Sequence, residues 1–356
     1  MISLEEVAKR AQVSAATASR ALSRPEMVAA QTRERVALAA RELGYQPNVL
    51  ARSLRQRGSR SIGLIITDIL NPFHATLAKG VQDAASAHEY TVLLFNSDEE
   101  HDKERRALDS LRGHLPRGLI VVPTSRTREN LKLVPNLPTI ELDRTSGRED
   151  AHSVMVDNLG GARAAVAHLA ALGHRRIGMV VGRLDITTAV ERFQGYREAL
   201  SAAGIPFRDE LVLPGNHREE DGRVAAHALL SKPPLERPTA LFVGNNEMTV
   251  GAVLAARALN LNIPRDLSIV GFDDSRWAQT MQPALTVVEQ PAYNLGLLAC
   301  ETLLGLLERG ATPGPTQVRL SARLILRDST ASPSSAKKLE RPKVRHQWPS
   351  KRFPLE

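Results

Sequence analysis

The sequence predicts a small all-α domain at the N-terminus, followed by a larger α/β body built on doubly wound parallel sheets. Two observations support this expectation. The first 45 residues contain short apolar periods of helical spacing that begin at good capping residues. After residue 60, short β-rich runs alternate with longer helical segments, as is typical of α/β folds. At 356 residues the chain also exceeds one average domain.

Capping residues indicate the first two helices. Ser3 and Glu6 have the spacing of a capping box, in which each side chain pairs with a free backbone amide. Ser14 is a good N-cap for the second helix because its hydroxyl can accept a backbone N–H. The residues expected to face the core are Leu4, Val7, Ala8, Ala11, Ala18, Ala21 and Leu22.

A third helix follows, with Val36, Ala39, Ala40 and Leu43 at helical spacing and Gly44 placed to end it. Ala29 stands at its start, where a missing side-chain cap costs about 1 kcal/mol. Three short helices around a small apolar centre indicate a helix-turn-helix.

The outward face of the second helix predicts contact with DNA. Its expected contact residues are Ser14, Ala15, Ala16, Thr17, Ser19 and Arg20. These side chains are small enough for a major groove, and Arg20 can pair with guanine or phosphate. Residues 1–60 carry 11 Lys and Arg against 5 Asp and Glu, whereas the whole chain carries only +8. This basic end fits phosphate neutralisation, although a plain helical hairpin with a solvated basic face is the alternative.

The body shows the alternation of a doubly wound fold. Strands are expected at 62–67, 91–95, 118–122, 153–156, 176–181, 239–243 and 268–272. Helices are expected near 74–88, 101–112, 159–172, 188–203, 219–231 and 247–260. The strands are continuous apolar runs, as in parallel sheets covered on both faces.

Ligands of such sheets bind beyond the carboxyl ends of the strands. Asp143, Asn245 and Asp273 follow apolar runs in this way, and Arg192 opens a helical segment. Carboxylate, amide and guanidinium groups suit a polyhydroxylated ligand. Each polar residue near a strand end also has an alternative role that involves no ligand. Asp143 and Asp274 can cap a turn or helix, Arg192 can form a surface ion pair, and His217 can face solvent.

The chain resembles the LacI/GalR family of bacterial transcription regulators over about residues 2–330. The motifs that carry the resemblance are Leu4-Glu5-Glu6-Val7-Ala8, Val13-Ser14, Thr17-Ala18-Ser19-Arg20, Arg33-Glu34-Arg35-Val36, Leu43-Gly44-Tyr45, Pro47-Asn48 through Leu54, Ile62-Gly63-Leu64-Ile65, Asn71-Pro72-Phe73, Val156-Asp157-Asn158, Leu172-Gly173-His174-Arg175-Arg176-Ile177, Gly195-Tyr196 and Val270-Gly271-Phe272-Asp273-Asp274.

The resemblance implies that residues 48–57 are a hinge helix that folds on operator DNA. Such a segment is too short for a stable isolated helix, so coupled folding is physically reasonable. Leu54 matches the leucine that wedges into the minor groove and kinks the duplex. The implied contacts of this segment are Asn48, Ala51, Arg52, Leu54 and Arg55. A plain basic linker is the alternative.

The resemblance also implies a periplasmic-binding-protein-like body of two subdomains with an effector in the cleft between them. The expected division is 1–46 for the helix-turn-helix domain, 47–60 for the hinge, 61–160 plus 291–320 for the N-subdomain, 162–290 plus 321–330 for the C-subdomain, and 331–356 for a disordered basic tail. The effector contacts implied are Phe73, Asp143, Arg192, His217, Asn245 and Asp273.

The sequence departs from the family pattern at several positions. Asn246 replaces an acidic residue, which removes an expected charge, and His74 stands where many relatives have a second aromatic residue. Ala15 and Ala16 limit direct base reading to apolar contact, for instance with a thymine methyl.

Several classes of protein are disfavoured. The sequence has no long apolar run for a membrane span and no secretory core, which argues against a periplasmic protein. Cys300 is the single cysteine, so a disulfide within one chain is impossible and a cytoplasmic location is expected. Phosphate-loop, nucleophile-elbow and metal-ligand motifs are missing. We therefore expect no cofactor, no bound metal and no catalytic residues.

The last 26 residues carry 7 Lys and Arg against 2 Asp and Glu and are rich in Pro and Ser. They predict a disordered basic tail without the leucine heptads of a tetramerising helix. We expect a homodimer that reads two half-sites of a pseudo-palindromic operator.

Together these features predict a dimeric transcriptional regulator, a repressor whose operator binding responds to a sugar or sugar acid. An inducer is favoured over a corepressor, and a nucleobase remains a possible ligand. Two alternatives share the body fold: a sugar-binding protein without regulation, and a sugar-modifying enzyme with Asp143 and Asp273 as acid and base.

Overall fold

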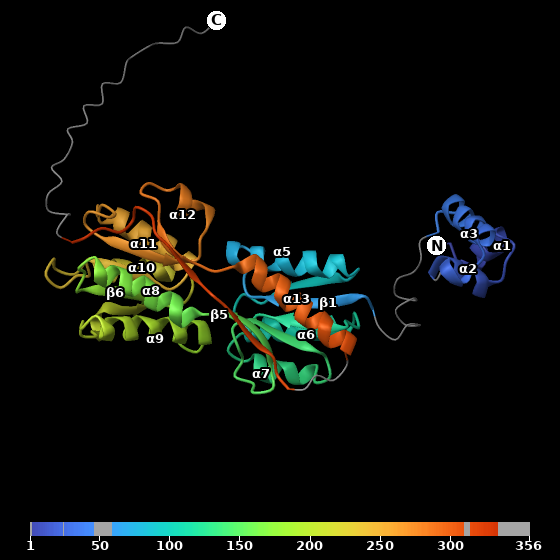
Figure 1. Ribbon diagram of the computed structural model, residues 1–356, viewed down its shortest axis with the longest axis horizontal. Helices are drawn as coiled ribbons and strands as arrows, with labels where there is room; N and C mark the ends of the chain where they lie inside the picture. Colours follow the sequence, from blue (N-terminus) through green and yellow to red (C-terminus); the bar gives the residue numbers. More distant parts are fainter. Residues whose placement is uncertain (1, 24, 46–58, 310–313, 334–356) are drawn as a thin grey trace, which may run out of the picture. The chain divides into compact units, whose positions relative to one another are not determined.

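The computed structural model describes residues 2–23, 25–45, 59–309 and 314–333. The chain divides into two compact units (Figure 1). A small unit contains residues 1–61 together with 114–117, and the rest of the chain forms the body.

The N-terminal domain consists of α1 (Leu4–Arg10), α2 (Ala15–Ser23), a short 3-10 turn (Pro25–Met27) and α3 (Ala30–Glu42). The predicted capping box is confirmed, because Ser3 Oγ accepts from the Glu6 amide and the Glu6 carboxylate accepts from the Ser3 amide. Ser14 Oγ accepts from the Thr17 amide at 3.1 Å, so the predicted cap of α2 is also confirmed.

The third helix also agrees with its sequence. Ala29 provides no side-chain cap to α3. Gly44 follows the helix end with φ +62°, a left-handed conformation that glycine adopts without strain. The core that joins the three helices consists of Val7, Ala8, Ala11, Ala18, Ala21, Val36, Ala39 and Ala40.

The first half of the body is a six-stranded sheet in the order β11-β5-β4-β3-β1-β2. The pairs β11–β5, β5–β4, β4–β3 and β3–β1 are parallel. Its strands are β1 (Ser61–Ile66), β2 (Thr91–Asn96), β3 (Gly118–Val121), β4 (Thr139–Asp143), β5 (His152–Val156) and β11 (Gln317–Leu320). Its helices are α5 (Pro72–Ala87), α6 (His101–Arg112), α7 (Thr127–Asn130) with the turn Leu131–Leu133, and α13 (Ala292–Arg309).

The second half is a six-stranded sheet in the order β12-β10-β9-β8-β6-β7, in which β12 is antiparallel to β10. Its strands are β6 (Ile177–Val181), β7 (Val212–Pro214), β8 (Ala240–Val243), β9 (Ser268–Phe272), β10 (Thr286–Glu289) and β12 (Arg323–Ile325). Its helices are α8 (Asn158–Ala171), α9 (Thr187–Ala202), a turn at Asp209–Leu211, α10 (Glu219–Leu230), α11 (Asn246–Ala258) and α12 (Arg276–Thr280).

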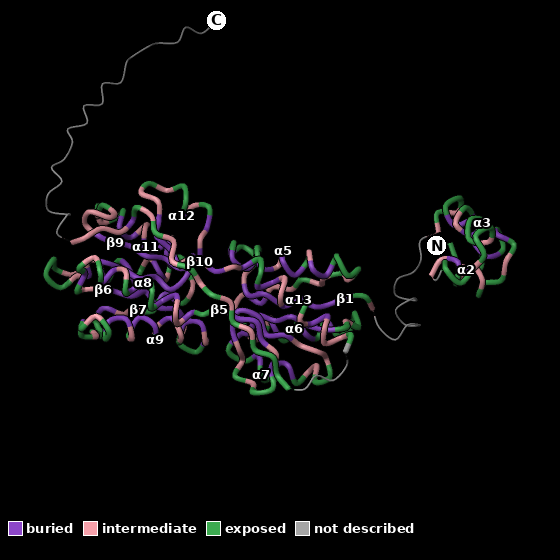
Figure 2. Tube along the Cα trace, in the orientation of Figure 1, coloured by how far each residue is buried: buried purple, intermediate pink, exposed green. Residues whose placement is uncertain are grey.

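Helices cover both faces of each sheet, so the central strands are buried (Figure 2). The chain passes between the halves three times: after β5, after β10 and after β11. The predicted doubly wound fold is confirmed. Strands β4, β7, β10, β11 and β12 are additions to the predicted set of strands. The last four are only three or four residues long and carry little periodic signal.

Helices α5 and α13 cover one face of the first sheet and touch backbone to backbone (Figure 1). A Cβ on Gly80 would lie 2.1 Å from the Tyr293 carbonyl oxygen, and one on Gly296 would lie 2.0 Å from that of Leu77. Cys300 of α13 is buried, as predicted, and burial raises the pKa of its thiol to about 12. Within the described residues, no helix is long and apolar enough to span a membrane.

The end of the described chain is attached to the second half through His174, which is only 2% exposed. His174 Nε2 lies 3.0 Å from the Ala331 carbonyl oxygen, and Nδ1 lies 2.9 Å from Thr239 Oγ1. The carbonyl can only accept, so the network assigns the proton to Nε2. Ala331, the first residue of the predicted tail, is thus held in the body, and residues 334–356 lie outside the described part.

The buried imidazole predicts a pH-dependent stability. Burial lowers the pKa of His174 from 6.5 to about 4. The folded state therefore binds this proton less readily than the unfolded state, and stability is lost as pH falls through the interval from 6.5 to 4. We expect about 3 kcal/mol of the free energy of unfolding to disappear over this interval. Urea unfolding at pH 7 and pH 4 measures the loss.

His174→Gln should reduce this pH-dependent loss, whereas the same change at exposed His88 should leave it as in the parent chain. An identical pH dependence in the parent and His174→Gln chains would show that His174 does not cause it.

Candidate functional site

The predicted DNA-contacting face of α2 is accessible. Ser14, Ala15, Ala16 and Arg20 are exposed, while Thr17 and Ser19 are half-buried. Ser14 Oγ also lies 2.9 Å from Thr17 Oγ1, so the two hydroxyls fix each other at the start of the helix. The remaining predicted contacts, Asn48, Ala51, Arg52, Leu54 and Arg55, lie outside the described residues.

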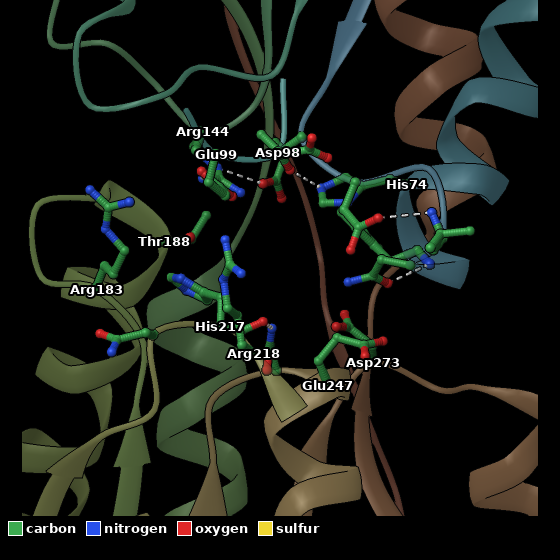
Figure 3. Close-up of a pocket in the computed structure, with 18 of the residues that line it drawn as sticks. His74, Asp98, Glu99, Arg144, Arg183, Thr188, His217, Arg218, Glu247 and Asp273 are labelled. Carbon is green, nitrogen blue, oxygen red and sulfur yellow. Dashed lines mark hydrogen bonds and ion pairs between the residues drawn. The ribbon is translucent and has the colours of Figure 1, made fainter. Parts of the chain in front are cut away.

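A cleft of about 770 Å³ lies between the two halves of the body (Figure 3). Its lining comes from the loops at the carboxyl ends of the strands and from the helix starts that follow them. The six predicted effector contacts all line it: Phe73, Asp143, Arg192, His217, Asn245 and Asp273. The strand-end residues Asp143, Asn245 and Asp273 therefore lie in one place, together with Phe73, Arg192 and His217.

Asp143 and Asp273 occupy equivalent positions in the two halves. Asp143 is the last residue of β4 and Asp273 follows β9, with φ values of +70° and +76°. Both side chains are buried, at 4% and 8% exposure. Burial raises the pKa of Asp273, and this rise is opposed by the charge of Arg192 and by the hydrogen bond from Gln290. Gln290 Nε2 donates to Asp273 Oδ1 at 2.5 Å.

Arg144, which follows Asp143, fixes one wall of the cleft. Its Nε donates to Asp143 Oδ2 at 3.1 Å, and its Nη1 donates to both oxygens of Glu99 at 3.0 and 3.1 Å. The guanidinium is 6% exposed, and although burial opposes its charge, the two carboxylates raise its pKa. This charge-assisted network holds the Asp143 carboxylate in one orientation.

Arg192 lies within α9, one turn beyond its start at Thr187, so the prediction that it opens the helix is wrong. It is 5% exposed, and burial lowers its pKa. Nε donates to Asn158 Oδ1 at 2.8 Å, Nη1 donates to the Gly244 carbonyl at 2.5 Å, and the guanidinium stacks 3.7 Å from the Phe272 ring centre. Among the described residues Nη2 has no acceptor, and it remains available to a ligand.

Two histidines contribute buried nitrogen atoms to the cleft. His74 Nε2 lies 3.2 Å from Thr67 Oγ1, while Nδ1 has no described partner. His217 is half-buried, with its ring over Gly182 and its Nδ1 buried without a described partner. Burial lowers the pKa of both rings, well below 6.5 for His217, where three arginines add to the effect. Both imidazoles are therefore neutral at pH 7.

The remaining predicted residues have partly structural roles. Asn245 caps α11, because its Oδ1 accepts from the Met248 amide at 2.9 Å while its Nδ2 donates to the His217 carbonyl. Asn246 carries no charge, as noted from the sequence, and its Oδ1 accepts from Ser275 and Trp277. Phe73 is 9% exposed and packs edge-on against His74, with ring centres 5.3 Å apart.

Two further aspartates have structural roles. Asp157 caps α8 by accepting from the Gly160 amide at 2.8 Å. Asp274 does not line the cleft but forms a two-pronged ion pair with Arg327 at 2.6 and 2.8 Å.

The sequence interpretation missed other polar side chains of the lining, among them the charged Glu99, Arg144, Arg183 and Glu247 and the amide of Gln290. Figure 3 shows Glu99 and Arg144 extending from the first half, and Arg183 and Glu247 from the second. A detectable signal existed for each, because each lies in a segment that directly follows a strand.

The cleft is suited to holding a polar ligand by directed hydrogen bonds. In the described part of the chain, six buried side-chain atoms lack a partner, and four of them belong to the cleft: His74 Nδ1, Asp143 Oδ1, His217 Nδ1 and Gln290 Oε1. Buried polar atoms are normally paired, so this concentration marks a place where a ligand or water completes the bonding. No three His, Cys, Asp or Glu side chains among the described residues are placed to hold a metal ion.

A helix-turn-helix domain followed by a two-halved α/β body with a polar cleft defines a class of DNA-binding regulators. The model of bacterial regulatory proteins of the lacI family matches residues 3–48, and a periplasmic binding protein-like domain matches residues 166–330. The chain belongs to the LacI family and is a DNA-binding transcriptional regulator, not an enzyme.

Relatives match over nearly the whole chain. Catabolite control protein A of Priestia megaterium is 35% identical over 333 residues, which cover 92% of this chain and 99% of the relative. The HTH-type transcriptional repressor PurR of Serratia proteamaculans (strain 568) is 36% identical over 308 residues, 85% of this chain and 90% of the relative.

Solved structures match in the same way. The Lac repressor dimer bound to operator and the anti-inducer ONPF has a TM-score of 0.82 at 27% identity, covering 93% of this chain and 99% of that one. The transcriptional regulator CelR in complex with cellobiose has a TM-score of 0.70 at 30% identity, covering 92% of this chain and 100% of that one.

Proposed function

We propose that the protein is a dimeric repressor whose operator affinity is set by a small polyhydroxylated effector in the cleft of the body. The carrying observation is that four buried side-chain atoms of the cleft lining have no hydrogen-bond partner among the described residues. A volume of about 770 Å³ lies in the range that holds a small molecule. Sugar hydroxyls can donate to the carboxylates and accept from Arg192 and the imidazoles.

The two halves of the body give the effector a way to act. We assign the N-subdomain to 61–160 plus 291–320 and the C-subdomain to 162–290 plus 321–330, with the hinge at 47–60. A ligand that bonds to Asp143 and Asp273 together favours one angle between the subdomains. By linkage, an effector that weakens operator binding must itself bind less well to the operator complex.

Several further assignments belong to this proposal. The dimer reads a pseudo-palindromic operator with Ser14, Ala15, Ala16, Thr17, Ser19 and Arg20 of each copy, and the protein works in the cytoplasm. The named relatives support repression, the Lac repressor structure supports a dimer, and the CelR complex supports a sugar-class effector.

The proposal is tested by fluorescence anisotropy with DNA from the region upstream of the protein's own coding sequence. We expect salt-dependent binding, with at least one sugar of a broad panel changing the operator Kd by tenfold or more. A protein that binds sugars without binding this DNA would support the non-regulatory alternative instead.

Arg20→Ala tests the DNA-binding face. Arg20 is exposed on α2 and carries the longest side chain of that face. We expect a loss of about 1–3 kcal/mol in specific operator binding, or roughly 5- to 150-fold, with a smaller loss on random DNA. Competition anisotropy with both DNAs gives the ratio.

Arg41→Ala, which removes an exposed arginine from the far end of α3, is the matched control and should leave the ratio unchanged. Equal losses of affinity on operator and random DNA for Arg20→Ala would show that Arg20 contacts the phosphate backbone and does not read a base.

A further inference from the structure

The cleft carries an excess of uncompensated negative charge. Nine carboxylates and five cationic side chains line it. Three of the cations are neutralised within the protein: Arg144 by Glu99 and Asp143, Arg183 by Asp185, and Lys103 by Asp98 and Glu100. Five lining carboxylates have no ion pair within the described chain: Asp68, Glu219, Asp221, Glu247 and Asp273. Among the described lining residues, Arg192 and Arg218 are the cations that remain to balance these five carboxylates.

These carboxylates come from both halves of the body and act on one another. Asp68 follows β1 of the first half, whereas Glu247 lies in the first turn of α11 in the second half. Burial raises the pKa of Glu247, and the charges of Asp68, Glu219 and Asp273 raise it further. Like charges on opposite walls oppose closure of the cleft unless a cation lies between them.

An independent observation also points to a ligand with donors at this end. Gln290 is 7% exposed and donates to Asp273 through Nε2, so its Oε1 is a buried acceptor without a described partner. Figure 3 shows Glu247 and Asp273 next to each other in the second half. A buried acceptor beside carboxylates needs a donor rather than another acceptor.

We propose that this acidic end of the cleft, formed by Asp68, Glu247 and Asp273 with Gln290 Oε1, binds an ammonium group, so that the effector is an amino-substituted sugar or polyol. The inference rests on the proposed effector function of the cleft. A metal ion is not the occupant, because no three acidic or histidine side chains of the described chain are placed to coordinate one. A sugar acid would add a further negative charge to a cleft that already has an excess of carboxylates.

Calorimetric titration of the full-length protein tests the proposal with matched probes. D-Glucosamine, D-glucose and D-glucuronate share one ring and differ in charge, and the galacto and manno series repeat the comparison for other stereochemistries. We expect the amino sugar to bind at least tenfold tighter than the neutral hexose in the series that fits, with the hexuronate weakest.

Glu247→Gln keeps the acceptor for Asn246 Nδ2 but removes the charge. We expect the amine-to-hexose preference to fall by about tenfold or more in this variant. Glu220→Gln, which changes an exposed residue that pairs with Arg223 and lies outside the lining, should keep the preference.

The outcomes separate the two proposals. Equal affinity for the amine and the hexose, or tightest binding of the hexuronate, would overturn the ammonium site and leave the effector function standing. An unchanged preference for the amine over the hexose in Glu247→Gln would also overturn the ammonium site. If none of the nine sugars binds or changes operator affinity, the sugar-class effector fails, and the ammonium site fails with it.

Discussion

Arg192→Ala should abolish the effector response while the protein still binds its operator. Arg192 holds three neighbours at once, through hydrogen bonds to Asn158 and Gly244 and stacking on Phe272. These contacts fix the guanidinium, so its Nη2, which has no acceptor among the described residues, is oriented before a ligand arrives. We expect effector affinity to fall about 100-fold or more, or about 2.7 kcal/mol, because a preoriented charge-assisted hydrogen bond is lost.

Operator affinity without effector should change by no more than about threefold, because Arg192 lies in the body and not on the helix-turn-helix. Titration of the effector by calorimetry and of the operator by anisotropy gives the two numbers separately. Arg163→Ala, which removes an exposed arginine of α8 outside the cleft, is the control and should retain the response.

Loss of the buried guanidinium also leaves Asn158 Oδ1 and the Gly244 carbonyl without this donor, which costs about 1–3 kcal/mol of stability. Thermal unfolding therefore accompanies the binding measurements. A folded Arg192→Ala protein with a normal effector response would remove Arg192 from the site.

Gly80→Ala should strongly destabilise the first half of the body. The added methyl would lie 2.1 Å from the Tyr293 carbonyl oxygen and 2.9 Å from the Leu297 amide nitrogen. Both obstacles are backbone atoms of α13, so no side-chain rotation can relieve the overlap. The helices must separate, and we expect about 3 kcal/mol of the free energy of unfolding to be lost.

Gly113→Ala is the matched control, because the nearest atom to its new methyl lies at 3.4 Å. It should change stability by no more than about 0.5 kcal/mol. Urea unfolding of both variants gives the comparison, and equal stabilities would mean that α5 and α13 can separate at little cost.

The sequence predicts the helix-turn-helix, its caps and the doubly wound character of the body, because these properties depend on local patterns. Ser3 with Glu6, Ser14 and Gly44 each act within a few residues of their own position. The buried central strands are equally visible, since a strand covered on both faces must be apolar throughout. Short strands such as β7 and β12 are not visible, because three residues show no period.

The cleft is predicted only in part. The strand-end rule finds Asp143 and Asp273 because position along the chain is enough to place them. Their environments are not local, since Glu99 meets Arg144 across 45 positions and Gln290 meets Asp273 across 17. His217 shows the same limit, because its ring packs over Gly182 and its carbonyl accepts from Asn245, both of which lie in other segments of the chain.

By itself, then, the sequence determined that this protein has a helix-turn-helix and a doubly wound α/β body with polar groups at the strand ends. Local hydrogen bonds and apolar periods are sufficient for both, whereas the division of the body into two halves was implied only by the family resemblance. The tertiary structure alone decided which of those polar groups are already neutralised and which are not. Arg144 and Arg183 have carboxylate partners, whereas Asp68, Glu247 and Asp273 lack an ion pair among the described residues. Charge balance in a cleft depends on side chains from separate segments, and only folding brings them together.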